Sequence, residues 1–241
     1  MKEVTFSPTL RPRPKWIRYI SAYIVMFLGS IGAKIRVQGK HHMPKEGACV
    51  LVSNHFSYLD PFLIVYSIHR PTSFLMQNDL GIPLEFAWAP FIYGVVLTDR
   101  NKLAPSTIKI SLNALKNNEV LGVFPEGGIK GTVLASAKPG AVHLSSLKNV
   151  PIIPVGISGA EEGWTNLFKG IRSQIDVRIG KAFGPFSIKG SKEEKLKKTE
   201  SISSEMMCRI AALIPDDKHG IFDGDSRIKD YRAENGFNDL L

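Results

Sequence analysis

Short, uncharged runs rich in β-branched residues recur along this chain, and they limit its possible folds more than any other feature. They lie at residues 48–52, 72–76, 94–98, 120–124 and 151–157. Apolar runs of this length are typical of strands that are buried on both sides. Segments with the apolar spacing of helices separate several of them. Strands that alternate with helices predict an α/β fold with a largely parallel central sheet flanked by helices.

The remaining segments fit one such domain, which is the size expected for 241 residues. Clean alternation over residues 174–179 predicts an edge strand, and the polar tail beyond Pro215 is expected to be peripheral. Helices are expected at residues 61–66, 83–88, 105–115, 139–147 and 192–213.

The first of these strands runs into a polar loop, NHFSYLD, at residues 54–60. His55 is expected just past the carboxyl end of the strand, and Asp60 precedes Pro61 at the start of a helix. In proteins with a parallel α/β sheet, ligands bind at the edge formed by the carboxyl ends of the strands. A carboxylate that fixes one imidazole nitrogen leaves the other free to take a proton, so the pair suits a general base. The simpler alternative is that Asp60 only caps the helix and His55 is incidental.

Two further strands end in polar clusters that would meet the first at the same edge of the sheet. Arg100 follows Asp99 and offers a planar fork for phosphate or carboxylate, although a surface ion pair with Asp99 is the alternative. The other cluster is Glu126, Gly127 and Gly128, where glycines allow close backbone approach and offer amide donors to an anion or oxyanion, or simply form a turn. Lys130 is a second possible anion contact or a solvated side chain.

The charge of the chain predicts an acidic partner, because its formal net charge is +9. Residues 1–40 carry eight Lys or Arg and a single acid, and they flank an apolar segment at 16–33 instead of alternating with aromatic base-stacking positions. This arrangement favours an anionic membrane surface over nucleic acid. The uncharged part of the segment, Tyr19 to Ala33, holds 15 residues, short of the ~20 that span a bilayer.

We therefore expect residues 1–35 to form a basic arm and a membrane-associating helix, and residues 36–241 to form the catalytic domain. Aromatic residues near the start of the helix suit a membrane interface. Lys15, Arg18, Lys34 and Arg36 bracket it and are expected to reach lipid headgroups. Two alternatives stay open: a signal peptide, for which residues 29–33 are a loosely acceptable cleavage site, and a buried core helix.

The two cysteines, Cys49 and Cys208, lie far apart, which argues against a disulfide framework and for a reducing compartment. No CxxC or HExxH motif occurs, so no metal is expected. With the N-terminal segment, this predicts a membrane-associated protein on the cytoplasmic face.

The polar clusters also resemble the motifs of a known family. The loop at 54–60 is similar to the NHxxxxD motif of the glycerolipid acyltransferases, the group of 1-acylglycerol-3-phosphate acyltransferases. Gly94 to Arg100 resembles the second block of that family, FPEG at 124–127 the third, and VPIIP at 150–154 the fourth. The four blocks follow the family's order within residues 38–184.

The resemblance implies transfer of a fatty acyl group from acyl-CoA or acyl carrier protein to the hydroxyl of a lysophospholipid, with 1-acylglycerol-3-phosphate the best match and phosphatidic acid the product. It implies that His55 is the general base and that Asp60 orients it. Arg100 would hold the acceptor phosphate, the loop of Glu126 and Gly127 would shape the acceptor site, and Asn54 would contribute to substrate binding. No metal or prosthetic group is implied.

One departure from the family leaves the acceptor open. Where the family usually continues with Thr-Arg, this chain has Gly128 and Ile129, and Lys130 lies one position away. A lyso-aminolipid or a lysophospholipid with a larger headgroup therefore stays possible. Two other classes also stay open: a lipid esterase or thioesterase, for which residues 156–160 resemble a nucleophile elbow without its final glycine, and a non-catalytic lipid- or nucleic-acid-binding module.

Overall fold

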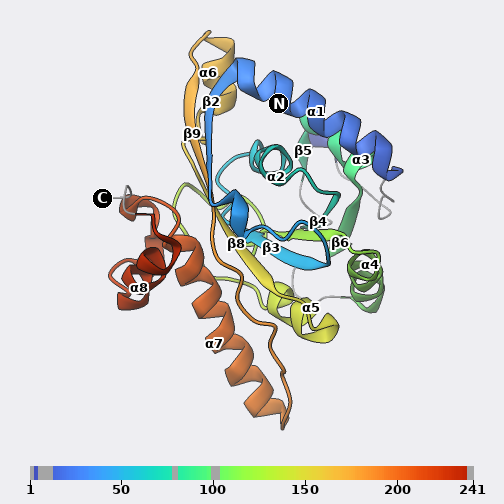
Figure 1. Cartoon of the computed structure of the whole chain (residues 1–241), viewed down its shortest axis with the longest axis vertical. Coiled ribbons are helices and arrows are strands. Elements are labelled where there is room, and N and C mark those ends of the chain that lie inside the picture. The colour runs from blue at the N-terminus through green and yellow to red at the C-terminus, as the bar shows by residue number, and fades with distance from the viewer. Residues whose placement is uncertain (1–2, 5–12, 78–80, 99–103, 238–241) are drawn as a thin grey trace.

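The chain forms one α/β domain around a seven-stranded sheet in a computed structural model that describes residues 3–4, 13–77, 81–98 and 104–237 (Figure 1). Its strands are β2 (Ala33–Gln38), β3 (Cys49–Ser53), β4 (Thr72–Gln77), β6 (Val95–Thr98), β7 (Val120–Val123), β8 (Ile152–Ser158) and β9 (Ser173–Ile179). They are ordered β2-β9-β8-β3-β7-β4-β6. In this sheet β8 and β9 pair antiparallel and the other neighbours pair in parallel, which confirms the predicted class. A separate short pair joins β1 (Glu3–Val4) to β5 (Ile82–Pro83).

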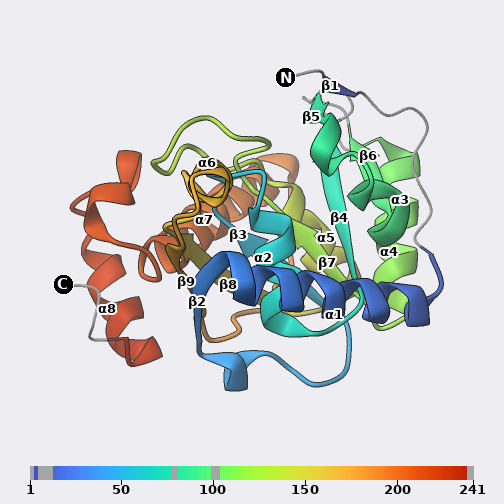
Figure 2. The ribbon, with the colours of Figure 1, turned by 90° about the horizontal axis from the view of Figure 1, so that it is seen from above.

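Helices cover both faces of the sheet (Figures 1 and 2). They are α1 (Lys15–Gly32), α2 (Asp60–Ile68), α3 (Ala89–Tyr93), α4 (Pro105–Lys116), α5 (Gly140–Lys148), α6 (Gly163–Phe168), α7 (Lys192–Ala211) and α8 (Ser226–Asn235). Single 3₁₀ turns occur at η1 (Lys40–His42), η2 (Leu84–Phe86), η3 (Asp216–Lys218) and η4 (Gly220–Phe222). The helices α1, α2 and α3 lie on one face, α4, α5 and α7 lie on the other, and α8 packs against α7.

The uncharged strands follow from this layering. In β3 the side chains of Val50 and Val52 pack into the core beneath α5 and α7, while Cys49 and Leu51 pack into the core beneath α2. Successive residues of a strand point to opposite faces, so a strand that is covered on both faces needs apolar residues at every position. The run at 48–52 is apolar for this reason, and it brings the loop that follows it to the middle of the sheet.

The expected strand at 174–179 forms as β9, but the prediction that it is an edge strand is wrong. Strand β2 pairs with it in parallel along its whole length, from Ala33 opposite Ser173 to Gln38 opposite Arg178, and β2 is the edge. Strand β2 was not predicted from the sequence, although Lys34 and Arg36 are exposed there and alternate with less exposed neighbours. The expected domain boundary at 35/36 falls inside this strand.

The expected helices form, with one shift in position. Residues 84–86 make only a 3₁₀ turn, and the α-helix expected over 83–88 begins at Ala89, where Pro90 lies in its first turn. The tail beyond Pro215 is largely polar, but Ile228 of α8 and Phe237 are buried.

Helix α1 lies on the domain with one apolar side uncovered. Arg18, Ser21 and Ala22 are the only residues of α1 that are buried. The alternative of a buried core helix is therefore wrong. No helix in the part of the chain that the structure describes is both long and apolar enough to cross a membrane. The exposed apolar side chains of α1 recur at helical spacing: Trp16, Tyr19, Ile20, Tyr23, Ile24, Phe27, Leu28 and Ile31.

Arg18 does not reach outward, and the expectation that it contacts headgroups is wrong. Its side chain is 3% exposed and forms a bidentate pair with Glu119, with nitrogen–oxygen distances of 3.0 and 2.8 Å. A buried guanidinium without a carboxylate partner is strongly destabilising. Arg18 therefore fastens α1 to the residue that precedes β7.

Candidate active site

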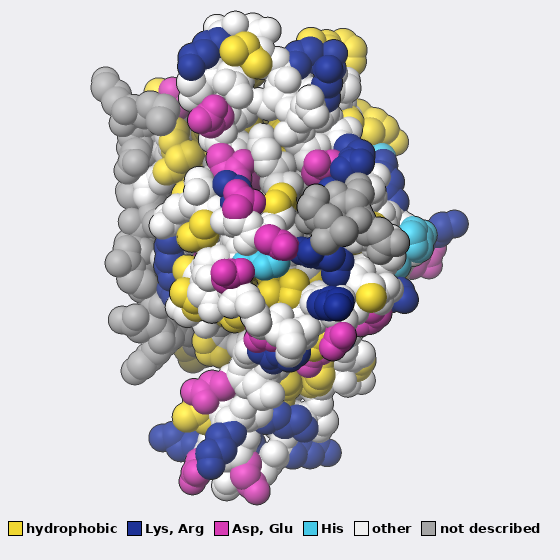
Figure 3. Space-filling model, turned by 90° about the vertical axis from the view of Figure 1, so that its left-hand side faces the viewer, with side chains coloured by type: hydrophobic (Ala, Val, Ile, Leu, Met, Phe, Trp, Pro, Cys, Tyr) yellow, Lys and Arg dark blue, Asp and Glu magenta, His cyan; other side chains and the backbone are white. Residues whose placement is uncertain are grey.

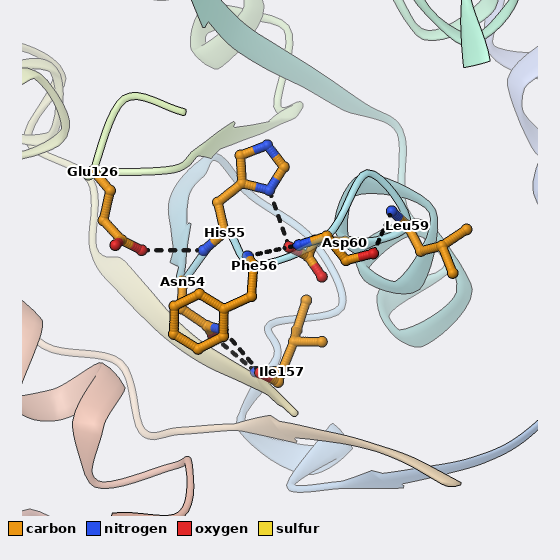
Figure 4. A network of polar contacts seen from close by, with 8 residues as sticks. Asn54, His55, Phe56, Leu59, Asp60, Glu126 and Ile157 are labelled. Atoms are coloured by element: carbon orange, nitrogen blue, oxygen red, sulfur yellow. Dashed lines mark hydrogen bonds and ion pairs between the residues drawn. The ribbon is translucent and has the colours of Figure 1, made fainter. Parts of the chain in front are cut away.

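His55 and Asp60 are in direct contact at the carboxyl end of β3. Nδ1 of His55 lies 3.0 Å from Oδ2 of Asp60, and the other ring nitrogen points away from that carboxylate (Figure 4). With Nδ1 donating to the carboxylate, Nε2 is left as an acceptor. The imidazole side chain is 15% exposed and faces a large cleft, while Asp60 is fully buried behind it. The geometry has the two features of a general base, namely a fixed tautomer and an accessible nitrogen.

Asp60 also shapes the loop that carries His55. Its Oδ2 accepts the backbone N–H groups of Phe56 and Ser57, each at 2.8 Å, so the side chain folds back on the loop instead of capping the amides of α2. Burial raises the pKa of Asp60 above its ordinary value, and hydrogen bonds from His55 and the two amides limit that rise. Its place in the first turn of α2 favours the charged form further.

Asn54 is fully buried and ties the same loop to β8. Its amide nitrogen donates to the carbonyl of Ile157 at 2.8 Å, and its carbonyl oxygen accepts the N–H of Ile157 at 2.9 Å. The side chain thereby continues the pairing of β3 with β8 beyond the strand end (Figure 4). Both polar groups of Asn54 are used by Ile157, so the side chain ties the loop of His55 to β8.

Glu126 supports the loop from the other neighbouring strand. Its Oε1 accepts the backbone N–H of His55, and its Oε2 accepts that of Ala135, both at 3.1 Å. The residue is 1% exposed, and burial raises the pKa of its carboxyl while these two amides and the nearby charges of His55 and Lys130 oppose the rise. Glu126 therefore acts on the site through the main chain of His55.

The turn after β7 presents glycine to the cleft. Gly127 and Gly128 have φ of 76° and 138°, a region that side chains disfavour. The N–H of Gly127 donates to the carbonyl of Phe124 at 3.0 Å, so it is used by the turn. Gly128 also lines the cleft, and within the described residues its N–H has no hydrogen-bond acceptor. Of the two amides that the sequence suggested for an anion, only that of Gly128 is free for one.

The cleft has a volume of about 1260 Å³ and is lined mainly by apolar side chains. The ring of Phe124 stacks on the imidazole of His55, with centroids 4.0 Å apart and planes at 18°. The apolar lining on the side of α2 and α3 includes Phe62, Val65, Phe74, Phe86 and Tyr93. Such walls leave few partners for water beside the imidazole.

Two lysines follow the turn after β7, and they lie differently with respect to the cleft. Lys130 is exposed and does not line the cleft, whereas Lys138 does. A Cβ on Gly127 would lie only 2.8 Å from Nζ of Lys138, so this ammonium sits against the turn. Lys138 was not predicted from the sequence, because nothing in its spacing distinguishes it from other lysines. Arg100 lies outside the described residues.

Other reactive groups do not form a second centre in the described part of the chain. Ser158 belongs to β8 and does not line the cleft, so the resemblance of residues 156–160 to a nucleophile elbow has no sharp strand-to-helix turn behind it. Cys49 and Cys208 are free and buried, and burial raises the pKa of Cys49 to about 11, which disfavours the reactive thiolate. The described residues contain no group of His, Cys, Asp or Glu that could hold a metal ion.

The chain combines a largely parallel α/β sheet with a histidine–aspartate pair at the end of a strand, and comparison with known proteins identifies its family. Residues 34–158 match the family model described as Acyltransferase, and the chain belongs to the acyltransferase family. The sheet is similar to the crystal structure of the 1-acyl-sn-glycerophosphate acyltransferase PlsC from Thermotoga maritima. The TM-score is 0.55 at 23% identity, over 77% of this chain and 78% of that one.

Curated relatives carry the same kind of name. The chain is 26% identical to 1-acyl-sn-glycerol-3-phosphate acyltransferase of Bacillus subtilis, over 73% of this chain and 88% of that protein. It is 30% identical to the enzyme of that name from Saccharomyces cerevisiae, over 60% of this chain and 49% of that protein. The chloroplastic enzyme of Brassica napus is 27% identical, over 61% and 43%. The chain thus spans about half the length of the yeast and plant relatives.

Proposed function

We propose that this protein is an O-acyltransferase that moves a fatty acyl group from an acyl thioester to the hydroxyl of a lysophospholipid. The acceptor that fits best is 1-acylglycerol-3-phosphate, and the product is then phosphatidic acid. The observation that carries the proposal is the His55–Asp60 pair, 3.0 Å apart, with the imidazole on a large apolar cleft. The names of the relatives support the choice of acceptor.

In the proposed reaction, Nε2 of His55 takes the proton of the acceptor hydroxyl as its oxygen attacks the thioester carbonyl. Asp60 stabilises the imidazolium that forms. The new C–O bond replaces the C–S bond, and the imidazolium returns its proton to the departing thiolate. We assign the free N–H of Gly128 to the carbonyl oxygen that becomes negative during attack. The apolar walls limit the access of water, which would otherwise compete with the lipid alcohol.

We assign the acceptor phosphate to the neighbourhood of Lys138. Its ammonium lies against Gly127, and Lys138 lines the cleft. The positive charge of the ammonium attracts a phosphate at this place. This assignment takes the role that the sequence gave to Lys130. Arg100 keeps its expected role of holding the acceptor phosphate, by analogy with the family.

We further propose that α1 lies in one leaflet of a membrane, with its apolar side in the lipid. Phe27 and Tyr23 of that side are 65% and 67% exposed, and large exposed apolar surfaces of this kind mark interaction sites. The lipid acceptor then reaches the cleft from the leaflet, and the cytoplasmic leaflet is the one we expect because it is anionic.

The test is transfer of a labelled palmitoyl group to 1-acylglycerol-3-phosphate by purified protein and by the His55→Ala variant. Removal of the base is expected to lower kcat by at least about 10³-fold. A matched control, His69→Ala, removes an exposed histidine outside the cleft and is expected to keep full activity. Transfer by His55→Ala at the wild-type rate, or release of free fatty acid at the same rate without acceptor, would contradict the proposal.

A further inference from the structure

The cleft that contains His55 continues into a groove between α5 and the first half of α7, and the proposed function leaves this groove unused. We call it the α5–α7 groove; α7 lines it with Lys192, Lys195, Leu196, Thr199 and Ser203. Each of these positions is three or four residues from another of the set, so together they form one stripe of the helix. The start of α7 projects from the domain at the end opposite α1 (Figure 1). The groove therefore lies away from the helix that we assign to the membrane.

Part of the wall of the α5–α7 groove is apolar and open to solvent. Leu147 of α5, Leu196 of α7 and Ile221 of η4 line it and are 50%, 58% and 68% exposed. Apolar side chains grouped in a groove are typical of a surface that a ligand covers.

A buried hydroxyl in the groove lacks a partner. Ser203 is 8% exposed and lines the cleft, and its Oγ has no hydrogen-bond partner among the described residues. A hydroxyl that is removed from water without a hydrogen bond costs free energy, so buried hydroxyls are normally paired. A ligand with an amide or another polar group in the groove would supply that partner, and a plain fatty chain would not.

Two lysines stand where the groove reaches the start of α7. Within the described residues Lys192 and Lys195 make no ion pair, whereas their neighbour Lys197 pairs with Glu193 at 2.7 Å. Glu193 and Glu194 lie in the same first turn of α7 and offset the positive end of the helix dipole, but neither of them lines the groove, whereas both lysines do. Glu200 also lines the groove, but further along the helix. The outward side of the same projection, at the bottom of Figure 3, mixes basic and acidic side chains. The groove end is thus suited to an anionic group.

We propose that the α5–α7 groove binds the phosphopantetheine arm of the acyl thioester donor, an inference that rests on the proposed acyl transfer. Lys192 and Lys195 contact its phosphate, Ser203 hydrogen-bonds to one of its amides, and the apolar walls cover its methyl and methylene groups. Lys192 and Ser203 are separated by about 16 Å along α7, a span suited to an extended arm. Coenzyme A thioesters and carrier-protein thioesters share this arm.

This assignment gives each substrate its own approach to His55. The lipid acceptor comes from the side of α1, and the water-soluble donor comes from the opposite end of the domain. The two therefore meet at the imidazole without competing for one entrance.

The first experiment compares the double variant Lys192→Ala/Lys195→Ala with a control of equal charge change, Lys197→Ala/Lys229→Ala, whose lysines are exposed and outside the groove. The double variant is expected to raise the KM for the donor about tenfold, because hydrogen bonds to charged groups are lost, with the KM for the lysophospholipid and kcat unchanged. The control is expected to match the wild type. An unchanged donor KM, or an equal rise in the acceptor KM, would overturn the inference.

The second experiment uses Ser203→Ala. Loss of the hydroxyl is expected to raise the donor KM about threefold, because one neutral hydrogen bond is lost, while the melting temperature stays the same or rises. A purely structural serine would leave the donor KM unchanged, which is the contrary result.

Both variants are assayed with palmitoyl-CoA and with palmitoyl-carrier protein to identify the source of the arm. A larger rise in KM with one donor identifies that donor as the source of the arm. An unchanged KM with both donors overturns the inference. If the wild type transfers no acyl group to any lysophospholipid, the proposed function fails by itself. In that case calorimetry with CoA and with the carrier protein decides, since equal affinity of wild type and lysine variant for both would overturn the groove assignment.

Discussion

The two ends of β7 each carry a buried glutamate, and the two are held in different ways. Glu119 precedes the strand and accepts the guanidinium of Arg18 and the hydroxyl of Ser73. Glu126 follows the strand, and among the residues that the structure describes it accepts hydrogen bonds from main-chain N–H groups alone, those of His55 and Ala135. The glutamate before the strand thus holds a helix by an ion pair, and the glutamate after it holds the loop of His55 by accepting hydrogen bonds from neutral donors.

This difference decides which of the two glutamates can be substituted by an apolar residue. Both partners at the first end are side chains, so apolar residues of similar volume can substitute for the pair. The donors at the second end belong to the backbone, and they stay buried whatever residue stands at position 126. We therefore expect the first end to govern stability and the second to govern both stability and catalysis.

The largest effect on stability is expected for Glu119→Ala. The variant leaves the guanidinium of Arg18 buried without its carboxylate, and this costs about 3–5 kcal/mol of unfolding free energy. Urea unfolding measures it. The kcat of the folded variant is expected to stay within about threefold of wild type, because His55 lies at the other end of the strand.

The matched control for that prediction replaces both partners, as Arg18→Met/Glu119→Leu. An apolar pair is expected to restore most of the loss, to within about 1 kcal/mol of wild type. If the double variant is as unstable as the single one, the ion pair itself and not the unpaired charge accounts for the loss.

A smaller loss of stability but a clear loss of activity is expected for Glu126→Gln. The side-chain amide nitrogen of glutamine cannot accept a hydrogen bond from the backbone N–H that it faces. The unpaired donor costs about 1–3 kcal/mol of unfolding free energy. Because one of these amides belongs to His55, kcat is expected to fall at least about tenfold. The exposed Glu46→Gln serves as control. Normal kcat in a destabilised Glu126→Gln variant would mean that Glu126 has no part in positioning His55.

The smallest effect concerns the pH dependence of that same loss. Burial raises the folded-state pKa of Glu126 above its ordinary 4.5, so its contribution to stability is full below about pH 4.5 and is lost as pH rises through the raised value. Gln does not titrate. The loss caused by Glu126→Gln is therefore expected to be larger at about pH 5 than at about pH 8, by at most about 1.4 kcal/mol for each unit of pKa shift. Urea unfolding of both proteins at the two pH values checks the sign, and a smaller loss at the lower pH would contradict it.

Much of the fold could be predicted because its signals are local. The apolar runs became β3, β4, β6, β7 and β8, and helices α2, α4, α5 and α7 formed at the expected segments. The place of β9 could not be predicted, because its neighbour β2 lies about 140 residues away and carries an equally ordinary alternating pattern. Sequence periodicity shows that a strand exists, and pairing across the sheet shows which strand is the edge.

The candidate site divides in the same way. His55 and Asp60 are five residues apart, and one tight loop was enough to predict their contact. The partners of Arg18 and Glu126 lie 101 and 71 residues away, and Lys138 was indistinguishable from Lys130 by spacing.

The sequence by itself determined where strands and helices form and that an imidazole and a carboxylate meet at a strand end, because hydrophobic periodicity and turn chemistry act over a few residues. Only the tertiary structure decided that Arg18 is buried, that Glu126 holds the main chain of His55 and that a groove leads to α7. Such contacts join residues far apart in the chain, and packing of the two faces of one sheet selects them.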